Sequence, residues 1–532
     1  MRSLLFFAAL ASALPAQARE VVTASAPEKL SVTVYRDPER GEGDEMDKEW
    51  PQGFAMISET RTVTLPAGES TIRFAGVAEG MVAVSAIVTG LPGGTIEKNR
   101  NANLLSPASL VDGTLGNRVT ITRTDPATGV ARSESAIVRT RADGGLVLQT
   151  AQGFEAVRCS GLPEQLTFDR VPDGLSAQPV FTIDTRSPAG GTYQVTLTYI
   201  SWGFDWEANY VARLREGTGE GKLKLDLMSW LTIVNDNDQS FDGAQLLAVA
   251  GKLNVDSDFE SLADPPQARP LSLTCYPFGS TAAGSPIYGF PPPPPPPPPP
   301  PAAMYSDDSS EIVVTAQRID RKMLEAASPI SVVAAEEMLG DLKLYRVPEP
   351  VDVSAKGQKQ VAFLDRKAVK GQFLYLADCN RGGEEDLVPT AMQLLALNEK
   401  ADGLGQSLPM GGITIYEPTE AGDLLVGETR LRDYALSQEV ELELPESSQV
   451  QASCGLLGEY DEKAKWRSMQ AVVTNANPDP VIIRLKLGWA SDIEVKGLKG
   501  VRVKDGERIV DVKVPANSRR TYDFRLREVG YE

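Results

Sequence analysis

The stretch Lys222-Leu223-Lys224-Leu225-Asp226-Leu227 alternates charged residues and leucines without interruption. Successive side chains of a β-strand point to opposite faces, so this pattern predicts a strand with one face on a core and the other in water. Similar alternating runs occur at residues 30–35, 60–65, 119–122 and 194–200. Gly, Pro, Asn and Asp interrupt the runs at the short spacing that is typical of sandwiches and barrels. The sequence therefore predicts an all-β fold.

A weak internal repeat predicts that this fold consists of repeated β-sandwich-like modules. Residues 63–74, 353–364 and 512–524 each contain one strand-like run, a small turn and a second run. The turns carry Ala-Gly, Lys-Gly and Ala-Asn, which supply residues that tolerate positive φ. Helical periodicity is scarce, and the two best helix candidates, residues 334–344 and 390–400, are short.

A run of eleven prolines, Pro291–Pro301, divides the chain into two halves. Proline cannot donate to a sheet, so this run predicts a polyproline II spacer about 34 Å long. Because sheets are often assembled across insertions, strands from both halves can complete one sandwich. We expect a signal peptide over residues 1–18, an N-terminal β-domain over 19–100, middle β-strands over 101–170, the first part of a β-sandwich over 171–278, a Pro-rich flexible linker over 279–338 and the second part of the sandwich over 339–532.

The first residues have the order of a cleaved secretory signal. Met1-Arg2 is followed by an apolar run over residues 4–14 and by the small-x-small site Ala16-Gln17-Ala18. The alternative is a buried N-terminal helix. No cysteine follows the apolar run to carry a lipid, and no later apolar segment reaches the roughly 18 residues of a membrane helix. We therefore expect a soluble mature protein without a membrane span, in the periplasm or exported to the outer envelope.

The composition restricts the chemistry of the protein. Asp and Glu number 72 against 53 Lys and Arg, so most of the surface would repel a nucleic acid. Histidine is absent, which excludes Ser-His and Cys-His nucleophiles, imidazole bases and histidine metal ligands. Carboxylate chemistry, Ser-Lys chemistry or no chemistry remain. We expect no catalytic residues, no metal site and no cofactor.

Four cysteines occur, Cys159, Cys275, Cys379 and Cys454, and none belongs to a CxxC motif. An even number in an oxidising compartment predicts two disulfides, for which three connectivities exist. We favour Cys159–Cys275 and Cys379–Cys454, because each pair lies within one half of the chain. Free buried thiols are the alternative.

The segment that follows the prolines resembles the TonB box of outer-membrane receptors. Such a segment on a flexible tether can add a strand to a partner protein, which is β-augmentation. An ordinary edge strand or a plain linker are the alternatives. The sequence thus predicts a TonB-like partner at Glu311, Ile312, Val313, Val314, Thr315 and Ala316.

Three further groups of residues have a functional and a structural interpretation. Trp202, Trp206 and Tyr210 form either a ligand platform or, as we favour, part of a sandwich core. Residues 235–243 are similar to a calcium loop but lack its final glutamate, so an Asx-rich hairpin turn is the better interpretation. The acidic residues 37–50 predict a solvated loop between two strands, although paired carboxylates of a glycosidase are an alternative.

Several segments together resemble a family of secreted bacterial proteins. They are residues 155–163, 203–210, 340–350, 403–405, 408–409 and 475–478. The family is the one whose main domain is of unknown function, of the four-one-three-nine type, with mucoidy-inhibitor-like relatives. The resemblance implies an all-β exported protein and no particular activity. The coiled coil of the mucoidy-inhibitor-like relatives is missing here, so their partner contacts are not carried over.

These observations predict an exported cell-envelope protein that binds or scaffolds an envelope protein or glycan through β-surfaces. The alternative is a carboxylate-based hydrolase of envelope glycans. A hydrolase would place two or more acidic residues with raised pKa values in one deep pocket. A scaffold would show exposed edge strands or an apolar groove.

Overall fold

The computed structural model describes most of the chain between Arg19 and Val529. The described residues are 19–101, 104–125, 127–140, 143–144, 146–156, 164–172, 175–216, 222–251, 253–263, 272–273, 333–339, 342–380, 386–420, 422–457 and 466–529. Strands make up almost all of the regular structure there, which confirms the predicted all-β fold. The helical elements among these residues are α1 (Pro107–Gly113), α2 (Phe259–Ala263) and the 3₁₀ turn η1 (Lys400–Asp402), and none is long and apolar enough to cross a membrane.

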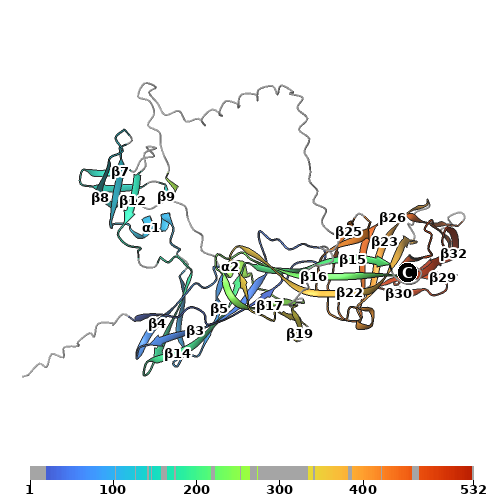
Figure 1. Cartoon of the computed structure of the whole chain (residues 1–532), viewed down its shortest axis with the longest axis horizontal. Coiled ribbons are helices and arrows are strands. Elements are labelled where there is room, and N and C mark those ends of the chain that lie inside the picture. Colours follow the sequence, from blue (N-terminus) through green and yellow to red (C-terminus); the bar gives the residue numbers. More distant parts are fainter. Residues whose placement is uncertain are drawn as a thin grey trace, which may run out of the picture. The chain divides into compact units, whose positions relative to one another are not determined.

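The chain divides into two compact units (Figure 1). Unit 1 comprises residues 1–102, 178–266 and 332–532, and unit 2 comprises residues 103–177 and 267–331. Unit 2 is therefore formed by two segments that interrupt unit 1 along the sequence. Each unit is described separately below.

Unit 1 begins with two sheets that share one core. The smaller sheet has the order β1 (Glu20–Thr23), β4 (Gly68–Ala75), β13 (Val180–Ser187), β6 (Thr95–Asn101). The larger sheet has the order β19 (Ala335–Leu339), β20 (Leu342–Arg346), β17 (Phe241–Ala250), β2 (Lys29–Tyr35), β3 (Phe54–Leu65), β14 (Gly191–Trp202), β5 (Met81–Thr89), and β21 (Val351–Val353) also pairs with β17. Ile72 and Phe181 of the smaller sheet and Ile57 and Leu197 of the larger sheet lie in one hydrophobic cluster, as in a sandwich.

The rest of unit 1 is a thirteen-stranded sheet. Its main order is β25 (Gly422–Leu431), β24 (Gly411–Thr419), β15 (Phe204–Glu216), β16 (Lys222–Asn235), β22 (Gly357–Asp378), β23 (Val388–Leu397), β26 (Glu439–Leu456), β27 (Arg467–Asn475), β32 (Ser518–Glu528), β29 (Ile493–Lys496), with β28 (Val481–Trp489), β30 (Arg502–Lys504) and β31 (Glu507–Val514) off this path. The long strands β15, β16 and β22 run side by side (Figure 1). In the sequence, β16 precedes the proline run and β22 follows it. Strands from both halves of the chain therefore complete one sheet.

The two longest strands of unit 1, β22 and β26, connect separate cores. Phe363 of β22 and Leu442 of β26 belong to the core that extends into the N-terminal sandwich. Further along the same strands, Ala377 and Ala452 belong to a second core with β27, β28, β31 and β32. A single long strand can serve two cores because its side chains continue to alternate beyond the first one.

Both predicted helices of residues 334–344 and 390–400 are wrong. Residues 335–339 and 342–346 form the antiparallel pair β19–β20, and β23 ends at Leu397. Leu394, Leu395 and Ala396 are all buried, so β23 is covered on both faces there. Such a strand has a continuous apolar run, which periodicity cannot distinguish from a short buried helix. Strand β19 also overlaps residues 279–338, where the sequence predicts a flexible linker, over residues 335–338.

In each copy of the internal repeat, two consecutive strands pair with two different partner strands. The turn between the two consecutive strands has one residue at positive φ. The φ angle is 103° at Gly68, 43° at Lys356 and 46° at Asn517. The turns join β3 to β4, β21 to β22 and β31 to β32. The partners of these strand pairs are also consecutive in sequence: β14 and β13, β17 and β16, β28 and β27. The same four-strand module therefore occurs three times, and the predicted strand–turn–strand repeat is confirmed.

Two of the three modules share a buried asparagine that holds the corner. Asn235 donates to the carbonyls of Gln239 and Ser354 at 2.9 and 3.1 Å. Asn475 makes the equivalent bonds to the carbonyls of Asp479 and Pro515 at 2.9 and 3.0 Å. Each side chain also accepts from the backbone N–H two residues later, at Asn237 and Asn477. This shared geometry, absent from the weak sequence repeat, indicates that the two modules are structurally equivalent.

We expect Asn235→Ala and Asn475→Ala each to lower the free energy of unfolding by about 2–3 kcal/mol. Asn235→Ala removes three hydrogen bonds and Asn475→Ala at least three, each with a net contribution of about 1 kcal/mol, from a buried position. Denaturant unfolding of the full chain measures the loss. Asn99→Ala is the control, because the exposed side chain of Asn99 donates to the side chain of Glu97 and has no other hydrogen bond to the described residues. A loss no larger than that of the control would contradict the shared role.

Unit 2 is built on a five-stranded antiparallel sheet. Its order is β11 (Gly153–Ala156), β10 (Val147–Thr150), β8 (Ala131–Val138), β7 (Arg118–Thr124), β12 (Glu164–Phe168), and β9 (Asp143–Gly144) pairs separately with β18 (Ser272–Leu273). Helix α1 begins with Ser106, whose hydroxyl accepts from the N–H of Ser109 as an N-cap. Val111 of this helix packs in one cluster with Val119 and Leu148 of the sheet. One face of the sheet is therefore covered by α1.

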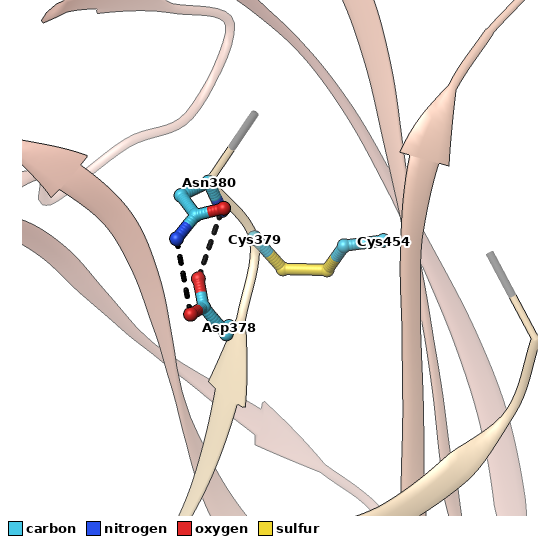
Figure 2. The surroundings of a disulfide bond; sticks show 4 residues. All are labelled: Asp378, Cys379, Asn380 and Cys454. Atoms are coloured by element: carbon cyan, nitrogen blue, oxygen red, sulfur yellow. Dashed lines mark hydrogen bonds between the residues drawn. A yellow bond between two sulfur atoms is a disulfide. The ribbon is translucent and has the colours of Figure 1, made fainter. Parts of the chain in front are cut away.

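One disulfide lies in the second core of unit 1. Figure 2 shows Cys379, directly after β22, joined to Cys454 of β26, with their Cα atoms 5.1 Å apart. This confirms one of the two predicted pairs. A link that closes a loop of 75 residues contributes roughly 4 kcal/mol by the loop-entropy account. The predicted partners Cys159 and Cys275 lie outside the described residues.

Candidate functional site

The segment over residues 203–210, which carries part of the family resemblance, forms the start of β15. Alternation of the strand sends Phe204, Trp206 and Tyr210 into the main core of unit 1. The Trp206 indole N–H donates to the carbonyl of Val249 at 3.1 Å, and the Tyr210 hydroxyl donates to that of Pro409 at 2.7 Å. Trp202 is buried as well. The interpretation as sandwich core is confirmed for Trp206 and Tyr210, whereas Trp202 packs in a separate small cluster with Val82 and Ala263.

The opposite face of β15 carries buried carboxylates. Asp205 pairs with Arg40 at 2.8 Å, and each side chain is only 3% exposed. The same carboxylate oxygen accepts from the backbone N–H groups of Trp206 and Asp37, at 2.7 and 3.2 Å. Asp205 thus holds the loop between β2 and β3 against β15. The acidic stretch of residues 37–50 is this loop, as predicted, and its acidic side chains are mostly exposed.

Two more arginine–carboxylate pairs extend this contact. Glu207 pairs with Arg430 at 3.2 Å, and Arg430 also donates to the carbonyl of Asp44 in the loop. Arg36 binds Asp433 through both terminal nitrogens, at 3.0 and 2.7 Å, and its guanidinium lies 5.6 Å from the Trp206 ring. We call Arg36, Arg40, Asp205, Glu207, Arg430 and Asp433 the arginine clasp. It joins residues that are far apart in the sequence.

Asp205 and Glu207 of the arginine clasp are the candidates for a pair of catalytic carboxylates on β15. Burial raises the pKa of Asp205 to about 6, against the lowering influence of Arg40 and of the two backbone N–H groups. A raised pKa is typical of catalytic acids. However, one oxygen of Asp205 is bound by Arg40 and two backbone N–H groups, one oxygen of Glu207 is bound by Arg430 and the N–H of Met46, and both residues are buried. This arrangement is that of a structural anchor.

The calcium-like loop over residues 235–243 is a structural turn. Lys356 contacts the carboxylates of Asp236 and Asp238 at 3.3 and 3.7 Å, so a cation of the chain already lies there. Burial and the neighbouring Asp238 raise the pKa of Glu79 beside them. In the described part of the chain, no group of His, Cys, Asp or Glu side chains has a geometry that could hold a metal ion. The Asx-turn interpretation is the one that the hydrogen bonds of Asn235 support.

A pocket of about 590 Å³ lies at one end of the sheet in unit 2. Its polar lining is Thr114, Asn117, Arg118, Asp169 and Arg170. Gly113, Phe168 and Pro172 complete the wall. The volume is within the usual range of small-molecule sites, roughly 300–1,000 Å³. The pocket is therefore large enough for a small organic ligand.

The local fold explains why these residues meet. Strands β7 and β12 pair with Val119 opposite Phe168, so Arg118 and Asp169 occupy the next positions at the same end of the two strands. Thr114 follows the last turn of α1, and the chain then leads through Asn117 into β7. A Cβ atom on Gly113 would lie 2.8 Å from Pro172, so glycine allows the two walls to approach closely.

The polar groups of the pocket have few partners within the chain. Arg118 and Arg170 are exposed, and neither forms an ion pair or a side-chain hydrogen bond with a residue that the structure describes. Thr114 is only 7% exposed, and its hydroxyl finds no hydrogen-bond partner among those residues. A buried hydroxyl without a partner is unfavourable, because desolvation is not compensated. The pocket thus offers two guanidinium groups to a ligand, and the Thr114 hydroxyl is buried in its wall.

Sequence reasoning missed this pocket. Its residues come from two short segments, 113–118 and 168–172, and neither contains a known motif. One compositional signal was present: residues 103–177 contain seven arginines and no lysine, against eight Asp and Glu. This region is nearly neutral in a chain of net charge −19, and arginine is the residue suited to bidentate recognition of anions.

Several predicted features lie outside the described residues. They are the signal peptide over residues 1–18, the proline run, and the TonB-box-like segment Glu311–Ala316. No protein-family model and no curated protein matches the chain. The resemblance stated above therefore stays a prediction, as do the TonB-like partner and the export signal.

Proposed function

We propose that the protein is an exported cell-envelope protein that binds a negatively charged ligand in the pocket of unit 2 without chemical conversion. The observation that carries this proposal is the pair of guanidinium groups, Arg118 and Arg170, that line the pocket without a partner in the described chain. Arginine binds carboxylates and phosphates through two parallel hydrogen bonds. Asp169 is the one carboxylate among the described residues of the lining, so the charged side chains of those residues sum to a positive charge.

A carboxylate-based hydrolase is the less supported alternative. Such an enzyme requires two accessible carboxylates that flank a substrate. Asp205 and Glu207 are adjacent on one face of β15, but the arginine clasp covers and neutralises both. Among the described residues that line the unit 2 pocket, Asp169 is the single carboxylate and has no second acid to complete a pair. Binding without conversion is therefore the better supported proposal.

Binding of polymeric probes by the full chain tests this proposal. We expect dextran sulfate and polyglutamate to bind, neutral dextran not to bind, and both anionic polymers to keep their length on size-exclusion chromatography. Arg118→Gln should weaken binding about tenfold, which is the loss of one charge-assisted pair. Arg132→Gln, an exposed arginine of unit 2 outside the pocket, is the control. Absence of binding, an equal effect of the two variants, or shortened polymers would contradict the proposal.

A further inference from the structure

The geometry points to a carboxylate-bearing sugar, a uronic acid within an acidic glycan, as the ligand of the unit 2 pocket. This inference rests on the proposed function and adds the chemical class of the ligand. It follows from the whole lining, which combines cationic, hydroxyl-binding and apolar groups in one cavity.

The two arginines set the charge and the shape of the anionic group. A guanidinium presents a planar fork of donors that matches the two oxygens of a carboxylate. Arg118 begins β7, and Arg170 follows β12, so both are carried by the ends of paired strands.

Asp169 argues against a bare inorganic anion. Its carboxylate lines the same cavity as the two arginines and would repel a second negative charge that came close. A ligand that carries one carboxylate and several hydroxyls avoids this conflict, because a hydroxyl donates to Asp169 while the carboxylate binds the arginines. The side-chain amide of Asn117, which lines the same cavity, offers a further partner for hydroxyl groups.

The apolar part of the wall suits the body of a sugar. Phe168 is half-buried against the unit 2 core and also lines the pocket, and Pro172 lies across from Gly113. The C–H groups on a pyranose face can pack against an aromatic ring and a proline ring, whereas phosphate or sulfate gains nothing from such a surface. Polar groups placed around a small apolar wall are the usual design of a small-ligand site.

Isothermal titration of the full chain with glucuronate, glucose and inorganic phosphate tests the inference. We expect glucuronate to bind at least tenfold more tightly than either of the other two. Arg118→Gln and Arg170→Gln should each weaken glucuronate binding about tenfold, and Arg132→Gln should leave it unchanged.

The substitution Asp169→Asn distinguishes a uronic acid from an inorganic phosphate as the ligand. This substitution should weaken glucuronate binding and strengthen phosphate binding, since it removes both a hydroxyl acceptor and a repulsive charge. If phosphate binds as tightly as glucuronate, or if Asp169→Asn strengthens both, the uronic acid inference is overturned while anion binding stands. If none of the three small ligands binds but the anionic polymers do so through Arg118, the uronic acid inference alone falls. If no anion of either kind binds, the proposed function falls with it.

Discussion

Arg40→Met should lower the free energy of unfolding by about 3–5 kcal/mol at pH 7.5. The substitution leaves the carboxylate of Asp205 buried without its cation, and breaking one side of a buried ion pair typically costs this much. The loop between β2 and β3 would also lose the bond from Arg40 to the Trp206 carbonyl. Denaturant unfolding measures the loss. Lys48→Met is the matched control, because it removes a positive charge from an exposed site of the same loop.

Acidic pH should reduce the cost of Arg40→Met. In the folded protein the pKa of Asp205 is about 6, above its ordinary value of 3.8, so the folded state binds more protons than the unfolded state between these pH values. The contribution of Asp205 to the free energy of unfolding therefore falls by up to about 3 kcal/mol as the pH rises from about 4 to about 6. The neutral acid tolerates loss of Arg40 better than the anion does.

A double substitution checks the cause of this effect. Arg40→Met with Asp205→Asn should recover much of the loss at pH 7.5, because the amide oxygen still accepts from the backbone and no buried charge remains. Asp205→Asn alone should remove the fall in stability between pH 4 and pH 6. A cost of Arg40→Met that is independent of pH, or that is unchanged in the double variant, would contradict the ion-pair explanation.

Gly411→Ala should destabilise the protein by about 4 kcal/mol or more. A Cβ atom at this position would lie 1.7 Å from the carbonyl oxygen of Ala208, so β24 could no longer pair in parallel with β15. Forced overpacking costs about 1–3 kcal/mol, and each lost backbone hydrogen bond adds about 1 kcal/mol. The contact is with backbone, which cannot rotate away as a flexible side chain would. The free energy of unfolding measures the effect.

The next residue provides the control for this prediction. A Cβ atom on Gly412 would have its nearest contact at 3.9 Å, with a terminal nitrogen of Arg430. Gly412→Ala should therefore change stability by less than about 1 kcal/mol. Similar losses in the two variants would show that the close approach of β15 and β24 does not determine the need for glycine. Loss of amide protection limited to β15 and β24 in Gly411→Ala would locate the damage.

Much of the fold could be predicted from local pattern. Residues 222–227 alternate, and they lie in β16, with Leu223, Leu225 and Leu227 buried. The turn residues Gly68 and Asn517 were recognisable because few residue types accept positive φ, whereas in the Lys-Gly turn Lys356 has the positive φ instead of the glycine. The Cys379–Cys454 pair was also expected. Where local pattern failed, as in β23, burial on both faces had removed the alternation on which the prediction depended.

The candidate site could not be predicted in the same way. Arg118 and Arg170 are 52 positions apart in the chain and become neighbours only through the pairing of β7 with β12. Likewise, nothing in the sequence near Asp205 indicates that Arg40 neutralises it. The sequence of the β2–β3 loop is mostly acidic, but the residue of this loop that pairs with Asp205 is Arg40. Contacts between charged residues that are far apart in the sequence produce no periodic pattern in it.

The sequence by itself determined that the chain is built of strands, where its corners turn, and that histidine chemistry is absent. These properties depend on the alternation of side chains, on backbone sterics and on composition, and all three are local. Tertiary structure alone decided that the aromatics of β15 are core, that its carboxylates are neutralised by the arginine clasp, and that two arginines of unit 2 line a pocket. Burial, charge pairing and cavities depend on which distant residues meet, and that is set by the register and order of the strands.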